Sequence, residues 1–251
     1  MFSYSDDGMR AVDAKFEAQK IAFAPLTFQA VKSLLDLGIL RVISDGEGLT
    51  AREVAEKTGV SLYGVSVLTE IALGMGVLKL AEGSPERLAL GKIGWFLLED
   101  DMTRVNFNFS ADICYRGAQF LEESVAEGRP AGLHVFGDRW STIYEALSSL
   151  PERARESWFN FDHFYSDIAF PSALPLVFAG RPRSLLDIGG NTAKWALACC
   201  GYDQDVHVTI VDLPGQTAVA EKNVEAAGFS GRVDFFAGNV LDSDLTLPTG
   251  Y

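Results

Sequence analysis

Two glycines and two polar residues follow short apolar runs of the sequence, and their types suit the recognition of a nucleoside. Gly189 and Gly190 end the run SLLDI and let the backbone turn sharply against a ligand, which a Cβ would obstruct. Asp212 ends a second run, and its carboxylate can accept hydrogen bonds from both hydroxyls of a ribose. Asn239 follows a third run, and its amide can pair with an adenine edge. These residues together indicate a nucleoside site.

Strands and helices must alternate if these residues are to meet. We expect a strand over Ser184–Ile188, a helix from near Thr192, a strand ending at Asp212, a helix through Val219 to Ala227, and a strand ending at Gly238 and Asn239. Such a right-handed parallel unit places its site at the carboxyl ends of the strands. A glycine turn alone is weak evidence, because such a turn is about as often a simple strand-to-helix connection as part of a ligand site. Asp212 at the second strand end therefore carries most of the specificity.

The segments LLDIGGNTAKWA, TIVDLP and FFAGNVLD resemble three motifs of S-adenosylmethionine-dependent O-methyltransferases of the plant caffeate and bacterial polyketide type. The resemblance extends from about Ile21 to the end of the chain. It implies a mainly α N-terminal winged-helix dimerisation domain, followed by an α/β Rossmann-like domain of which this chain contains the first three parallel strands. It also implies S-adenosylmethionine as cofactor and a small aromatic or polyketide-like hydroxyl compound as methyl acceptor.

The resemblance also implies roles for individual residues. Asp187 and Gly189, with Gly190 in the same turn, would face the methionine portion of the cofactor, and Asp212 the ribose. The remaining expected cofactor-binding residues are Leu213, Asn239, Val240, Phe159 and His163. The family's turn has glycines where this chain has Asn191 and Ala193, and the Ala193 methyl is expected to weaken cofactor binding. No catalytic residue and no metal ligand is identified.

The N-terminal part has a helix, helix, hairpin pattern. Apolar residues recur at helical spacing from Phe16 to Leu40, Thr50 and Glu53 form a capping box, and Ser61 caps the next helix. Two short strands follow around the expected turn Gly83-Ser84-Pro85. This is the order of a winged helix. The helix from Ser61 to Met75 contains no Lys or Arg, so dimerisation is favoured over DNA reading.

Composition narrows the class of protein further. The chain has 251 residues, is 48% hydrophobic and carries a formal net charge of −13, which disfavours nucleic acid and anionic membranes as partners. Three cysteines are too few for a disulfide framework, and no signal peptide or spanning segment is evident, so a cytoplasmic protein is expected. The expected partners are a small-molecule acceptor and a second copy of the chain.

The motifs suggest three regions, namely residues 1–103, a helical region 104–180 rich in aromatic residues, and a cofactor domain 181–251. The chain is expected to end near the fourth strand, at Pro248 to Tyr251, which would leave strand Ser184–Ile188 with an unpaired edge. Three alternatives remain open: a non-catalytic dimer that binds the cofactor weakly or not at all, a winged-helix regulator, and, less favoured, a dehydrogenase.

Overall fold

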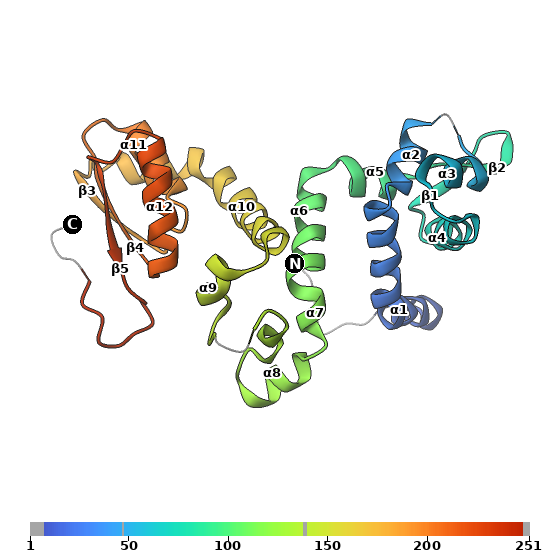
Figure 1. Cartoon of the computed structure of the whole chain (residues 1–251), viewed down its shortest axis with the longest axis horizontal. Coiled ribbons are helices and arrows are strands. Elements are labelled where there is room, and N and C mark those ends of the chain that lie inside the picture. The colour runs from blue at the N-terminus through green and yellow to red at the C-terminus, as the bar shows by residue number, and fades with distance from the viewer. Residues whose placement is uncertain (1–7, 47, 138–139, 248–251) are drawn as a thin grey trace. The chain divides into compact units, whose positions relative to one another are not determined.

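The computed structural model describes residues 8–46, 48–137 and 140–247, and it separates into two compact units (Figure 1). The first unit ends at Arg104 and the second begins at Val105. The segment Pro248 to Tyr251, where a fourth strand was expected to begin, lies outside the described residues. Each unit is described separately below.

The first unit is helical with one antiparallel hairpin. Its elements are α1 Ala11–Asp36, α2 Ile39–Asp45, α3 Ala51–Thr58, α4 Leu62–Gly74, β1 Leu78–Ala81, β2 Ser84–Leu90 and α5 Lys92–Glu99, and α6 Asp101–Phe109 crosses the boundary between the units. The expected order of helices and hairpin is present. The assignment as a winged helix stays a prediction.

Local signals set the ends of these elements as expected. The side chain of Thr50 accepts the Glu53 amide while the Glu53 carboxylate accepts the Thr50 amide, so the capping box begins α3. Ser61 caps α4 through the Gly64 amide. The predicted turn Gly83-Ser84-Pro85 is wrong in detail, because Ser84 already pairs with Ala81. The turn is shorter and is completed by Gly83, which has φ +72°.

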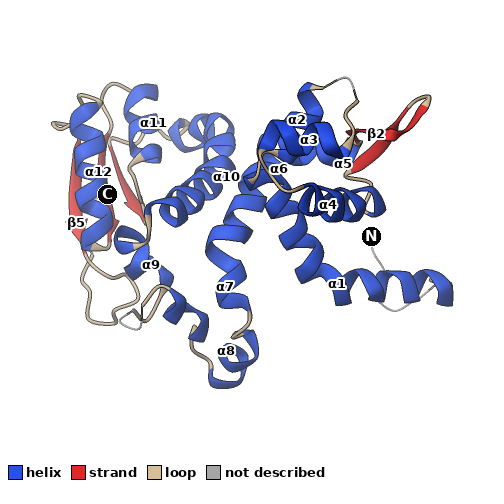
Figure 2. Ribbon diagram, turned by 45° about the vertical axis from the view of Figure 1, so that its right-hand side comes forward, coloured by secondary structure: helices blue, strands red, loops and turns tan. Residues whose placement is uncertain are grey.

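The second unit begins with several short helical segments and the long helix α10 Glu152–Phe178, and it continues into a parallel α/β layer (Figure 2). The helical segments are the π-helix Ser110–Cys114, α7 Tyr115–Ala118, α8 Leu121–Glu127, the 3-10 helix Ala131–Val135, α9 Ile143–Ala146, the 3-10 helix Leu147–Ser149 and α10 Glu152–Phe178. The layer consists of β3 Ser184–Ile188, α11 Lys194–Tyr202, β4 His207–Asp212, α12 Pro214–Ala226 and β5 Val233–Ala237.

The three strands pair in parallel in the order β3-β4-β5, so their carboxyl ends meet at one edge of the sheet. The core of the layer is apolar, with Val208 and Ile210 of β4 fully buried. Strand β5 ends at Ala237 rather than at Gly238 and Asn239, because Ala237 is the last residue in register with Asp212. Within the described residues, β3 forms an edge of this sheet, as expected.

Candidate functional site

The turn after β3 is held to the end of β4 by the carboxylate of Asp212. One oxygen accepts the backbone amide of Asn191 at 2.7 Å, and the other accepts the amide of Leu213 at 2.7 Å. Gly189 donates its own amide to the carbonyl of Val211 at 2.8 Å. Main-chain groups and one carboxylate therefore fix the shape of the turn, which charge-assisted hydrogen bonds make rigid.

Gly189 and Gly190 are required for different reasons. Gly189 has φ +76° with open space around it, a conformation that glycine adopts at little cost. Gly190 is buried, and a Cβ there would lie 2.7 Å from Asp187 Oδ2 and 2.8 Å from Ile210 Cγ2. Gly189 therefore provides the backbone conformation, and Gly190 provides the close packing of the turn on the sheet.

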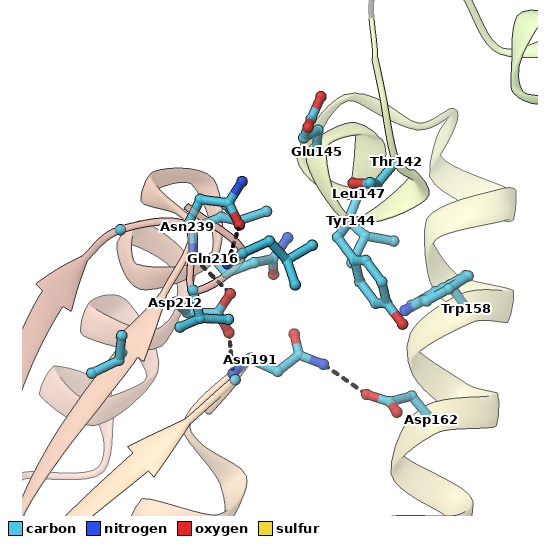
Figure 3. A pocket seen from close by; sticks show the side chains of 16 residues that line it. Thr142, Tyr144, Glu145, Leu147, Trp158, Asp162, Asn191, Asp212, Gln216 and Asn239 are labelled. Carbon is cyan, nitrogen blue, oxygen red and sulfur yellow. Dashed lines mark hydrogen bonds between the residues drawn. The ribbon is translucent and has the colours of Figure 1, made fainter. Parts of the chain in front are cut away.

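A cavity of about 350 Å³ opens at the carboxyl ends of the strands (Figure 3). The expected cofactor-binding residues that line it are Gly189, Asp212, Leu213, Asn239 and Val240. Asp212 and Asn239 lie on one side, and side chains from α9 and α10 lie across from them. The structure thus brings together five residues from three different turns.

The side of the cavity formed by α9 and α10 was not assigned from the sequence. It includes Tyr144 and Trp158, whose rings meet edge to face with centroids 6.0 Å apart, and the carboxylate of Asp162. The aromatic enrichment of this region was visible in the sequence, but its division between core and cavity was not. Asp162 accepts the side-chain amide of Asn191 at 2.7 Å, which connects α10 to the glycine turn.

Four expected residues do not line this cavity. Gly190 is the buried residue of the turn and packs on Asp187, whose Oδ2 is buried without a hydrogen-bond partner among the described residues. Phe159 and His163 line a second cavity behind the turn. The ring of His163 bonds the hydroxyl of Thr192 at 2.9 Å, so this histidine contacts the turn and not the first cavity.

Burial shifts the pKa values of two of these groups in opposite directions. Desolvation is the larger cause, and repulsion from Asp212 the smaller one, that together raise the pKa of Asp187 to about 6. Desolvation is also the larger cause for His163, and together with the positive charge of Lys194 it lowers the pKa of this ring. Near neutral pH, Asp187 is therefore mostly ionised but titrates easily, and His163 is neutral.

The two positions that depart from the family's glycines both adopt left-handed backbone. Asn191 has φ +49° and Ala193 has φ +70°. Ala193 is fully buried and forms the N-cap of α11, so the helix begins at Lys194, two residues later than expected. Asparagine tolerates this conformation, whereas alanine is strained in it.

No helix of the described residues is long and apolar enough to span a bilayer. The same residues contain no group of three His, Cys, Asp or Glu side chains placed to hold a metal ion.

The chain combines a helical first unit with a parallel α/β layer that has a cavity at its strand ends, and comparisons with known proteins show which proteins it is similar to. Residues 15–84 match the family model of the Dimerisation2-like domain. The chain is 22% identical over 233 residues to L-tyrosine C(3)-methyltransferase of Streptomyces lavendulae, which covers 92% of this chain and 62% of that protein. It is also 22% identical over 223 residues to 3-hydroxy-5-methyl-1-naphthoate 3-O-methyltransferase of Streptomyces sahachiroi, covering 89% and 62%.

A solved structure shows the same fold. The O-methyltransferase NcsB1 from neocarzinostatin biosynthesis, in complex with S-adenosylmethionine and 2-hydroxy-5-methyl naphthoic acid, matches with a TM-score of 0.68 and 21% identity, covering 89% of this chain and 67% of that one. The resemblance to the S-adenosylmethionine-dependent methyltransferases is thus confirmed. The matched region spans less than two thirds of the length of both Streptomyces relatives.

Proposed function

We propose that this chain provides the dimerisation and cofactor-binding parts of an S-adenosylmethionine-dependent methyltransferase that methylates a hydroxyl group of a small aromatic acceptor. The observation that carries the proposal is the cavity at the carboxyl ends of β4 and β5, where Asp212 and Asn239 lie across from Tyr144 and Trp158. This is the position at which open parallel sheets bind ligands.

The residues present fit the cofactor. Each oxygen of Asp212 accepts one backbone amide and keeps a lone pair for a ribose hydroxyl. Leu213 and Val240 offer apolar surface to an adenine ring, and Asn239 offers an amide to its edge. The Asp212 carboxylate and the flanking apolar residues therefore suit an adenosine group.

The aromatic side of the cavity suits the reactive end of the cofactor. When bound, S-adenosylmethionine supplies a methyl group on a positively charged sulfur. The faces of Tyr144 and Trp158 attract such cations when water is excluded, and the same rings give an aromatic acceptor an apolar surface. The chain's own contribution to the reaction is therefore to orient the reactants and to exclude water.

Both relatives support an aromatic acceptor, because their names specify tyrosine and a naphthoate. They differ in the atom that is methylated. Oxygen is proposed here because the naphthoate enzyme and NcsB1 are both named O-methyltransferases. Analysis of the methylated product by NMR distinguishes an aryl ether from a ring methyl.

Calorimetric titration with S-adenosylhomocysteine tests the proposal. We expect binding by the chain, and at least about tenfold weaker binding by Asp212→Asn, which loses the charge and one acceptor oxygen. The control Asp234→Asn changes an exposed carboxylate of β5 that pairs with His207, and it should bind normally. The absence of heat at millimolar ligand would refute cofactor binding.

We also propose that the chain forms a homodimer through its first unit. The matched family model is a dimerisation domain, and α1 exposes large apolar side chains at Val12, Phe16 and Phe23. Their spacing of four and seven residues places them on one side of the helix. A second copy of the chain would cover this stripe.

A further inference from the structure

A second cavity, of about 560 Å³, lies between α10, α11 and α12, and the cofactor proposal does not use it. Its lining includes Arg155, Phe159 and His163 of α10, Lys194 and Leu197 of α11, and Val219 of α12. Gln216 also lines it and is the residue shared with the first cavity. The two cavities are thus separate spaces with one side chain between them.

The charges in this lining leave one cation uncompensated. Lys194 pairs with Asp167 at 2.5 Å, and the lowered pKa of His163 leaves its ring neutral. Arg155 is half-buried, and its side chain has no hydrogen bond or ion pair to any described residue. A guanidinium removed from part of its water without a carboxylate partner is costly, so the cavity favours an anion.

Gln216 supplies a second, independent feature. Only 4% of this residue is exposed, and its Oε1 is buried without a hydrogen-bond partner in the described part of the chain. Rotation of the side-chain amide by a half-turn exchanges its oxygen and its N–H₂ group. A buried amide oxygen without a partner is rare, and after this half-turn the N–H₂ group in its place can donate to a ligand that accepts from it.

The rest of the cavity determines what carries the charge. Phe159, Leu197 and Val219 present an aromatic ring and branched aliphatic side chains. The nearby helix α11 begins after Ala193, which has no side chain that could cap the first-turn amides, so their partial positive charge remains. The chemistry of the site is therefore one oxyanion group next to an apolar body.

We propose that this second cavity binds a small organic monoanion, a carboxylate attached to an aromatic or branched aliphatic group. Arg155 binds the carboxylate in the two-pronged geometry of a guanidinium, and Gln216 donates from its amide. Phe159, Leu197 and Val219 cover the apolar body. This site does not depend on the proposed methyltransferase function.

Benzoate is the probe, and the methyl resonances of the full chain, labelled at Leu and Val, are the readout. We expect saturable shifts at Leu197 and Val219 with millimolar benzoate. Arg155→Gln should weaken benzoate binding at least about tenfold, because a charge-assisted pair of hydrogen bonds is lost. Benzamide has the same shape without the charge. It should bind the unaltered chain as weakly as benzoate binds Arg155→Gln.

Two variants separate the cavity from general effects. Arg183→Gln removes an exposed arginine that pairs with Asp205 and should leave benzoate affinity unchanged. Val219→Phe places a ring in the cavity while leaving Arg155 in place, and it should weaken benzoate binding. Asp212→Asn should keep benzoate binding even where it weakens S-adenosylhomocysteine binding, so the two proposals can fail separately.

Three results would overturn the proposal. Shifts centred on Leu213 and Val240 would place benzoate in the first cavity. Equal affinity for benzoate and benzamide would show that charge is not recognised. Unchanged binding by both Arg155→Gln and Val219→Phe would show that the ligand lies elsewhere.

Discussion

The carboxylate of Asp212 accepts the backbone amide of Asn191 at 2.7 Å, so the residue expected to bind a ribose also closes the glycine turn. The same carboxylate accepts the Leu213 amide and lies close enough to Asp187 to raise the pKa of that group. Asp212 therefore stabilises the turn through hydrogen bonds and destabilises it through charge repulsion.

These two effects predict a pH-dependent cost for Asp212→Asn. The variant loses one charge-assisted hydrogen bond, which costs about 1.5–3 kcal/mol. At pH 8 it also relieves the repulsion with ionised Asp187, whereas at pH 5 Asp187 is mostly protonated. Urea denaturation should therefore show a larger loss of unfolding free energy at pH 5 than at pH 8. An equal loss at both values would contradict the coupling.

Asp187 itself should make folding less favourable as the pH rises. Its pKa is about 6 in the folded chain and 3.8 in the ordinary state, so the folded chain holds more protons between these values. The stabilising contribution is full below about pH 3.8 and is lost as the pH rises through 6, a change of about 3 kcal/mol. The unfolding free energy of Asp187→Asn, relative to the unaltered chain, should rise by about 2.4 kcal/mol between pH 4 and 7, since the rest of the change falls outside this window. A flat difference would refute the shifted pKa.

The two glycines of the turn predict substitutions of different cost. Gly189→Ala meets no atom within 4 Å, so it should lose about 1–2 kcal/mol from its positive φ alone. Gly190→Ala places a methyl against Asp187 and Ile210, both fixed in strands, and should lose about 3 kcal/mol or more. Chemical denaturation of the two variants side by side measures the difference. A costlier Gly189→Ala would contradict the packing described for Gly190.

Much of this site follows from local sequence signals, and the remainder depends on tertiary geometry. Apolar runs bounded by glycine and an acid predict Ser184–Ile188 and the strand that ends at Asp212, because β-structure and turn chemistry are local. Phe159 and His163 reach a different cavity from the one expected, because one residue of a helix rotates a side chain by 100°. Such rotation cannot be read from a composition rich in aromatic residues.

At Ala193, the strain of the left-handed backbone is opposed by two stabilising effects of the methyl group, so the effect of restoring glycine depends on their sizes. Ala193→Gly relieves about 1–2 kcal/mol of left-handed strain at φ +70°. It loses about 0.8 kcal/mol of methyl burial and about 0.4–1 kcal/mol through the entropy of the unfolded chain. The unfolding free energy should therefore stay within about 1 kcal/mol of the unaltered chain.

Ala193→Val, a branched side chain in a fully buried left-handed position, should lose more than about 2 kcal/mol. Equal stabilities of the Gly and Val variants would contradict the strain.

The apolar stripe on α1 predicts the oligomeric state. Phe16 and Phe23 are 62% and 53% exposed and share one side of the helix, so the variant Phe16→Glu with Phe23→Glu should place four like charges in a dimer interface. Light scattering after gel filtration should give a dimer for the unaltered chain and a monomer for this variant.

The matched control is Ala18→Glu with Ile21→Glu, which adds the same charge on the opposite side, where Ile21 is 77% exposed. The control should remain dimeric. A monomeric unaltered chain, or a control that dissociates as readily as the variant, would place the interface elsewhere.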